Sequence, residues 1–183
     1  LGVISTRNHM NATFTDDFPL AGHVAVTSQS GAMGTILLDW AKETRIGFSQ
    51  FVSVGNKLDI DEADLLAYFR DDPDTNVIGM YIEGTRRGRE FIEQASATSR
   101  LKPIIALKAG RTSSGAKAAS SHTGALSGSD MVYSAAMAEA GVVRVKTLDE
   151  FFDLLQAFAS MPLPRGDGVA IVTNAGGLGV MAA

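Results

Sequence analysis

Short apolar runs with the composition of buried strands alternate along this chain with segments whose apolar residues follow helical spacing. Strands are predicted at residues 23–28, 48–54, 77–83, 103–108 and 142–145, and helices at 31–43, 61–71, 86–98, 129–140 and 147–160. Repeated strand–helix–strand units run their strands parallel, with right-handed crossovers that place helices on the sheet faces. The order therefore predicts an α/β fold with an open, mostly parallel, doubly wound sheet.

One segment breaks the alternation. Residues 109–128 form a Gly- and Ser-rich stretch of about twenty residues, and connections of that length are commonly functional or disordered. The stretch carries His122, which is flanked by hydroxyl-bearing residues and glycine. A neutral imidazole can attack a phosphoryl group and pass it on, whereas the alternative is a surface histidine with no chemical role. We expect residues 109–126 to be less ordered than the sheet when no phosphate or partner is bound.

A strand, a turn of small residues and a helix follow one another near the N-terminus. The buried-strand pattern of residues 24–27 runs into Ser28-Gln29-Ser30-Gly31, after which apolar residues recur at helical spacing. Ser hydroxyls, backbone N–H groups and the helix dipole together form an anion site at such a turn. The turn is neither a Walker A loop nor a G-x-G-x-x-G motif. The alternative is close strand–helix packing without a ligand.

A carboxylate stands at the end of another apolar run. Glu83 follows residues 77–82, and the carboxyl end of a buried parallel strand faces the ligand crevice of an open sheet. The other interpretation of Glu83 is a solvated loop acid beside Arg86 and Arg87.

Three acids precede or open the second predicted helix. Asp59, Asp61 and Glu62 are predicted to lie at its N-terminus, where they offset the helix dipole. A metal site is the weaker alternative, because the sequence shows no closed set of carboxylates.

Five motifs occur in one order along the chain. They are Ser28 to Gly31, residues 54–61, residues 81–84, residues 108–111, and Ser121 to Ala125. Together they make the chain resemble the NDP-forming acyl-CoA synthetases, specifically the α part of ADP-forming acetate–CoA ligase, which is related to the α subunit of succinyl-CoA synthetase. The resemblance covers nearly the whole chain and implies a flavodoxin-like fold. No single motif is specific, but their joint occurrence is.

The resemblance implies a role for each candidate residue. The histidine that matches His122 is the phosphorylated residue, and the glutamate that matches Glu83 orients it. Ser28, Ser30 and Gly31 match the helix start that holds the phosphate. Further loop residues that could contact the phosphate are Lys108, Arg111, Ser121, Thr123 and Gly124. A phosphohistidine carries about two negative charges and so needs donors and a dipole to rest against.

The implied reaction interconverts acyl-CoA, phosphate and NDP with free acid, CoA and NTP through the phosphohistidine. The complete enzyme would use CoA, ADP or ATP, and Mg, none of them bound by this fragment alone, which is expected to be inactive in the full cycle. The implied partners are an ATP-grasp domain or β subunit, an N-terminal CoA-binding domain, and a second copy in a homo-oligomer. Two alternatives stay open: a regulatory acyl-CoA-sensing module of a protein lysine acetyltransferase, and a simple phosphate-binding or phosphocarrier domain.

Composition narrows the function classes. The net charge of −4 at pH 7 leaves no basic footprint for nucleic acid. The chain has no cysteine, which excludes disulfides and cysteine catalysis and fits a cytoplasmic enzyme. No apolar stretch reaches the roughly 20 residues of a membrane span, so a membrane is not an expected partner.

The domain organisation expected from the sequence has three parts. Residues 1–21 are predicted to be an irregular linker from a missing CoA-binding domain, and residues 22–162 the phosphohistidine domain. Residues 163–183 are predicted to begin a further, truncated flavodoxin-like domain with a strand at 169–173 and a helix start after it. We expect this helix to pack on the first domain, to pack on a second copy, or to be poorly ordered.

Overall fold

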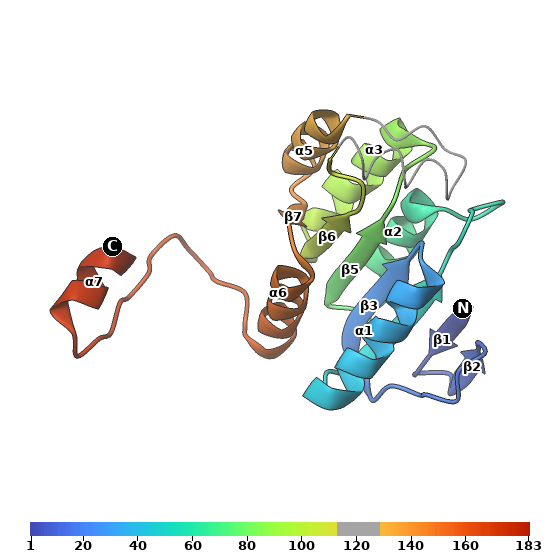
Figure 1. Cartoon of the computed structure of the whole chain (residues 1–183), viewed down its shortest axis with the longest axis horizontal. Helices are drawn as coiled ribbons and strands as arrows, with labels where there is room; N and C mark the ends of the chain where they lie inside the picture. Colours follow the sequence, from blue (N-terminus) through green and yellow to red (C-terminus); the bar gives the residue numbers. More distant parts are fainter. Residues whose placement is uncertain (113–128) are drawn as a thin grey trace.

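The computed structural model describes residues 1–112 and 129–183, and in that part of the chain a seven-stranded sheet has the order β2-β1-β4-β3-β5-β6-β7 (Figure 1). Its strands are β1 (Val3–Ser5), β2 (Met10–Ala12), β3 (Ala21–Ser28), β4 (Phe48–Ser53), β5 (Val77–Ile82), β6 (Ile104–Lys108) and β7 (Val143–Val145). The strands from β4 to β7 in this order pair in parallel, whereas β1 pairs antiparallel with β2 and β4. The expected open, mostly parallel sheet is confirmed.

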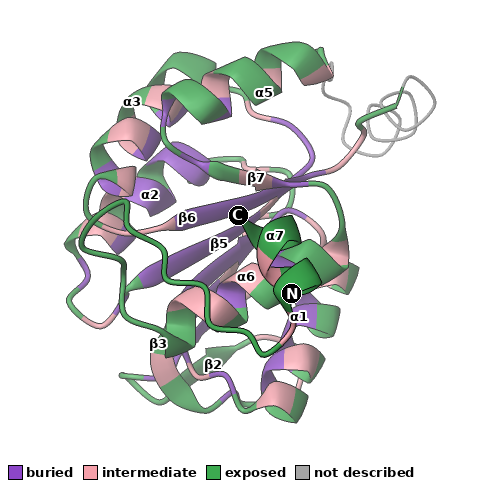
Figure 2. Cartoon of the chain, turned by 90° about the vertical axis from the view of Figure 1, so that its left-hand side faces the viewer, coloured by how far each residue is buried: buried purple, intermediate pink, exposed green. Residues whose placement is uncertain are grey.

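Helices cover both faces of the sheet (Figure 2). They are α1 (Gly31–Thr44), α2 (Glu62–Asp71), α3 (Gly88–Ser99), α5 (Asp130–Glu139), α6 (Leu148–Ser160) and the outlying α7 (Gly176–Ala182). Helices α1 and α6 bury their apolar stripes on one face, and α2, α3 and α5 on the other. The five predicted strands and five predicted helices of residues 23–160 all occur, each with ends within two residues of the prediction.

The sheet is buried from both sides because its central strands send alternate residues to opposite faces. In β3, Val24 and Val26 join the cluster under α1 and α6, whereas Ala25 joins the cluster under α2, α3 and α5. Helix α6 lies close to β5, since a Cβ added to Gly79 would come within 3.0 Å of Leu155. Helix α6 therefore packs directly against the middle of β5.

The N-terminal residues differ from the irregular segment predicted for them. They form the hairpin of β1 and β2, which adds to the open edge of β4, with Ile4 opposite Phe51 and fully buried. Strands of three residues are too short to show a period of two, so their pairing depends on the edge offered by β4. Gly2 has a φ of +145°, and a Cβ there would lie 1.9 Å from the Ala12 carbonyl oxygen.

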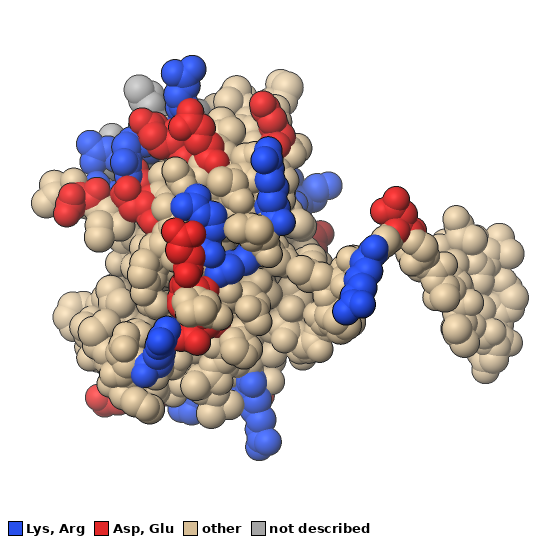
Figure 3. Space-filling view, turned by 180° about the vertical axis from the view of Figure 1, so that it is seen from behind, with Lys and Arg blue, Asp and Glu red and all other residues tan. Residues whose placement is uncertain are grey.

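The C-terminal residues also differ in part from the prediction. No strand forms at 169–173, because a strand needs a neighbour to take its backbone hydrogen bonds and none lies beside these residues in the described structure. The predicted helix start is confirmed as α7, but α7 extends away from the sheet instead of packing on it (Figure 1). Seen from behind, charges of both signs are interspersed over the domain and are sparse on this segment (Figure 3).

Candidate functional site

The candidate residues meet at the carboxyl ends of three neighbouring strands. Ser28 is the last residue of β3, Glu83 directly follows β5, and Lys108 ends β6. The register places Ser28 beside Tyr81 and Ile82 beside Lys108, so the three strands end at nearly the same level. This is the edge at which ligands bind in open parallel sheets.

The turn from Ser28 to Gly31 is held by its own hydroxyl groups. The Ser28 hydroxyl donates to the Ser30 carbonyl oxygen at 2.7 Å, and the Ser30 N–H donates to the Ser28 hydroxyl at 3.2 Å. Ser30 is the N-cap of α1, where its hydroxyl accepts the Met33 N–H at 3.3 Å. The remaining N–H groups of the first turn have no intrahelical acceptor and point with the positive end of the helix dipole toward the strand ends.

Two glycines at the start of α1 bear on whether close packing explains the small residues here. Gly34 is required by packing, because a Cβ there would lie 2.6 Å from the Phe51 ring. Gly31 is not, since the nearest atom to its added Cβ is the Leu1 nitrogen at an ordinary 3.6 Å. Close strand–helix packing therefore accounts for Gly34 but not for Gly31.

Gln29 joins this turn to the turn after β5, a role that the sequence analysis missed. Its Oε1 accepts the backbone N–H groups of Glu83 at 2.8 Å and Gly84 at 3.0 Å, while its Nε2 donates to the Gly84 carbonyl oxygen at 2.8 Å and to the Glu62 carboxylate. Only 7% of Gln29 is exposed. A primary amide can accept and donate at once, which makes Gln29 a rigid brace across the candidate site. Its signal in the sequence was an amide side chain directly after a buried strand.

Glu83 is buried, with 8% exposed, so the interpretation as a solvated loop acid is wrong. The two nearby arginines pair elsewhere. Arg86 donates to the Lys57 carbonyl oxygen at 3.1 Å, and Arg87 binds the Asp61 carboxylate at 2.6 Å. Gln29 holds the Glu83 backbone in place. The pKa of the neighbouring Tyr81 is raised, first by the burial of Tyr81 and second by the negative charge of Glu83.

Lys108 is buried under α5 and is not an exposed loop cation. Its ammonium group lies 4.6 Å from the centre of the Tyr133 ring and donates to the Ala109 carbonyl oxygen at 2.5 Å. Burial lowers the pKa of Lys108, and the positive charge of Arg144 lowers it further. The Tyr133 hydroxyl in turn accepts the Thr85 N–H at 2.9 Å, which links α5 to the turn after β5.

A buried ion pair contacts the turn after β5. Lys57 and Glu62 lie 3.0 Å apart with side chains 8% and 2% exposed, and the Lys57 ammonium also donates to the Gly84 carbonyl oxygen. Burial raises the pKa of Glu62, although the nearby Lys57 charge opposes this. Glu62 therefore lies in the first turn of α2 as predicted, but it is buried in the brace around Gly84.

The other two acids near α2 have separate places. Asp61 is confirmed at the helix N-terminus, where it is the N-cap and forms a capping box with Asp64. Asp59 is exposed and precedes the cap. Among the described residues, no group of three or more His, Cys, Asp or Glu side chains is placed to hold a metal ion.

The structure does not place every predicted residue. His122, Ser121, Thr123 and Gly124 lie outside the described residues, as does most of the segment 109–126 that was predicted to be less ordered. Arg111 is described and donates to the Lys146 carbonyl oxygen at 3.0 Å, beside the end of β7.

Residues 21–158 match the family model of the succinyl-CoA ligase-like flavodoxin domain. The chain belongs to this family. The resemblance inferred from the five motifs is confirmed by its relatives, which include α subunits of ADP-forming ligases.

The chain is 53% identical over 181 residues to the α subunit of acetate–CoA ligase (ADP-forming) I of Pyrococcus furiosus, covering 99% of the chain and 39% of that protein. It is 50% identical over 183 residues to the acetate–CoA ligase (ADP-forming) of Methanocaldococcus jannaschii, covering 100% of the chain and 26% of that protein.

The chain is also similar to a solved structure. It is the dinucleotide-forming acetyl-coenzyme A synthetase 1 of Ca. Korarchaeum cryptofilum in complex with phosphate and ADP, with a TM-score of 0.92 and 45% identity over 99% of the chain and 39% of that protein. The chain thus spans 26–39% of the length of these relatives. In the described part of the chain no helix is long and apolar enough to cross a membrane.

Proposed function

We propose that this chain is the phosphohistidine-carrying part of an ADP-forming acid–CoA ligase. The observation that carries the proposal is the juxtaposition of the α1 N-terminus with the buried Glu83, held together by Gln29 at the carboxyl edge of the sheet. Relatives of high identity are named acetate–CoA ligase and 4-hydroxybutyrate–CoA ligase, which supports an acid–CoA ligase as the reaction class.

In the proposed reaction, phosphate attacks the acyl-CoA thioester, and CoA leaves with formation of an acyl phosphate. An imidazole nitrogen of His122 then attacks the phosphorus atom, so that an N–P bond forms and the acid leaves as its carboxylate. NDP attacks the phosphohistidine, the N–P bond breaks, and NTP forms. The C–S bond of the thioester breaks in the first step and the P–O bond to the acyl group in the second, and the free imidazole is regenerated in the third.

The described residues would act by charge and orientation. Glu83 would accept the hydrogen bond of the second imidazole nitrogen, which fixes the tautomer that leaves the first nitrogen free to attack. The Ser28–Gly31 turn would hold the phosphoryl group through the N–H groups and the dipole of α1, an interaction of about 0.3–2 kcal/mol for a helix N-terminus. Gln29 would keep these two parts at a fixed separation.

The proposed partners follow from the share of the relatives that this chain spans. An N-terminal CoA-binding domain and an ATP-grasp domain or β subunit would supply the CoA and nucleotide sites, with Mg accompanying the nucleotide. Residues 1–21, 22–162 and 163–183 remain the proposed division into linker, phosphohistidine domain and start of a further domain. The proposed setting is the cytoplasm. No described feature favours an acetyltransferase module or a simple phosphocarrier.

The experiment that tests the function uses the whole protein together with its nucleotide-binding domain or subunit. Incubation with radiolabelled ATP should yield a phosphoprotein that is acid-labile and base-stable, as expected of phosphohistidine. His122→Asn should abolish both the adduct and NTP synthesis. His9→Asn is the matched control, because His9 is exposed on a turn at a φ of 48° that Asn tolerates. An adduct of unchanged yield in His122→Asn contradicts the mechanism.

A further inference from the structure

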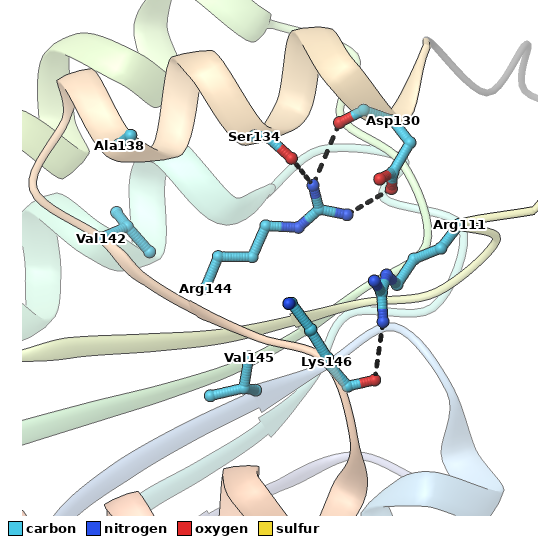
Figure 4. Close-up of a pocket in the computed structure, with 8 residues that line it drawn as sticks. All are labelled: Arg111, Asp130, Ser134, Ala138, Val142, Arg144, Val145 and Lys146. Atoms are coloured by element: carbon cyan, nitrogen blue, oxygen red, sulfur yellow. Dashed lines mark hydrogen bonds and ion pairs between the residues drawn. The ribbon is translucent and has the colours of Figure 1, made fainter.

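A cavity of about 320 Å³ lies between α5 and β7 (Figure 4). Four ionisable residues line it: Arg111, Asp130, Arg144 and Lys146. Arg111 follows β6, Asp130 begins α5, and the other two lie in and directly after β7. Figure 4 shows the Arg144 side chain reaching from β7 toward α5, with Arg111 and Lys146 beside it. The cavity is separate from the Ser28–Gly31 turn, which lies at the end of β3.

Arg144 is fixed in place by α5. Its side chain is only 12% exposed, and its Nη1 donates to the Asp130 carbonyl oxygen at 3.0 Å and to the Ser134 hydroxyl, while its Nη2 donates to the Asp130 carboxylate. Among the described residues these contacts use three of the five N–H donors of the guanidinium. The group is therefore oriented before any ligand arrives, which lowers the entropic cost of binding.

Arg111 and Lys146 contribute two positive charges to the cavity that are not paired with a carboxylate in the described residues. Arg111 donates to the Lys146 carbonyl oxygen at 3.0 Å, and the Lys146 backbone N–H donates to the Glu150 carboxylate at 2.7 Å. Within residues 1–112 and 129–183, neither side chain takes part in an ion pair. Their positive charges therefore stay available to a ligand.

The lining carries three cations against one carboxylate, which leaves two net positive charges. The pKa of Asp130 is lowered, chiefly by its hydrogen bond with Arg144, and also by the charges of Arg144 and Arg111. Asp130 is thus ionised and committed to Arg144. An anion of charge near −2 would neutralise what remains and relieve the repulsion between the other two cations.

We propose that this cavity binds a phosphate-bearing anion. The planar guanidinium groups of Arg111 and Arg144 match the geometry of phosphate oxygens, and the Lys146 ammonium adds a point charge. The cavity accepts free phosphate or the terminal phosphate of a larger molecule such as a nucleoside diphosphate. The proposal does not use Ser28, Gly31 or Glu83, and it assigns Arg111, one of the possible phosphate contacts of the sequence analysis, to this cavity.

The test is a titration of the full chain with inorganic phosphate, and in a parallel sample with ADP, followed by backbone and Arg side-chain NMR. Saturable shifts are expected at Arg111, Arg144 and Lys146. The double variant Arg111→Gln, Lys146→Gln should weaken binding there at least about tenfold, because it removes two charge-assisted contacts to the anion. Arg100→Gln is the matched control, since Arg100 is an exposed cation at the C-terminal end of α3 that does not line the cavity.

The outcomes separate cleanly. Saturation by either ligand supports the site, and the tighter of the two identifies the source of the phosphate. Shifts confined to Gly31–Met33 would support the helix N-terminus of the proposed function but overturn this site. Unchanged binding in the double variant, or equal non-saturating shifts with chloride at the same ionic strength, would also overturn it. Absence of shifts at Gly31–Met33 bears on the proposed function alone.

Discussion

Replacing Gln29 by Ala should break the connection between the Ser28–Gly31 turn and the turn after β5 that carries Glu83. The substitution removes the acceptor of the Glu83 and Gly84 N–H groups, at 2.8 and 3.0 Å, and one donor to the Gly84 carbonyl oxygen at 2.8 Å. A buried donor left without an acceptor costs about 1–3 kcal/mol. Two such donors, partly rehydrated by water that enters the space, predict a loss of about 2–4 kcal/mol in the free energy of unfolding.

Urea unfolding of the chain, followed by circular dichroism, measures this loss. Gln156→Ala is the matched control, because Gln156 is exposed on α6 and its replacement should change stability by less than about 0.5 kcal/mol. In the whole enzyme, Gln29→Ala should also slow formation of the phosphoprotein by about 10- to 100-fold, because the Glu83 backbone loses its fixed position.

A Gln29→Ala variant as stable as the parent chain would refute the brace, since it would mean that water replaces all of these bonds at no cost. A variant that loses the predicted stability but forms phosphoprotein at the parent rate would keep the structural role and refute the positioning role. Gln29→Glu distinguishes the acceptor of the amide from its donor. The variant keeps an acceptor for the two N–H groups, but it loses the donor and faces the Glu62 carboxylate. Its free energy of unfolding should therefore lie between those of the parent chain and Gln29→Ala.

Three further changes have expected outcomes. Leu155→Ala empties the contact of α6 with Gly79, and urea unfolding should show a loss of about 2–5 kcal/mol, whereas a loss below about 1 kcal/mol would mean that α6 does not pack on β5. Ser30→Ala removes the N-cap of α1 and should cost about 0.5–2 kcal/mol, with Ser30→Gly losing only a few tenths, and equal losses would contradict the capping role. Burial acts to raise the pKa of Asp61, but the Arg87 hydrogen bond and the capping N–H groups lower it below 3.8 on balance. The stability that this carboxylate contributes is therefore present above pH 3.8 and is lost as the pH falls through the folded-state pKa. The difference in the free energy of unfolding between the parent chain and Asp61→Asn should shrink on acidification. A difference that does not change with pH would argue against the Asp61–Arg87 interaction.

The alternation of strands and helices was readable from the sequence because it is a local property. Apolar runs that are buried on both faces, and helices with a stripe at 3.6-residue spacing, carry their own signature, and the ends of ten elements followed from it. The helix start at Ser30 and the position of Glu83 at a strand end were predictable for the same reason, because each depends on neighbours in the chain.

Tertiary structure decided what joins these elements. The hairpin of β1 and β2 forms because β4 offers an open edge. No strand forms at 169–173, because no described strand offers an edge beside these residues. Gln29 reaches Glu83 and Gly84 across 54 and 55 residues, and Arg111 reaches Lys146 across 35. Periodicity reports which face of an element is buried but not which element lies beside it. The order of the strands in the sheet therefore had to be known before the brace around Gly84 and the cationic cavity beside β7 could be recognised.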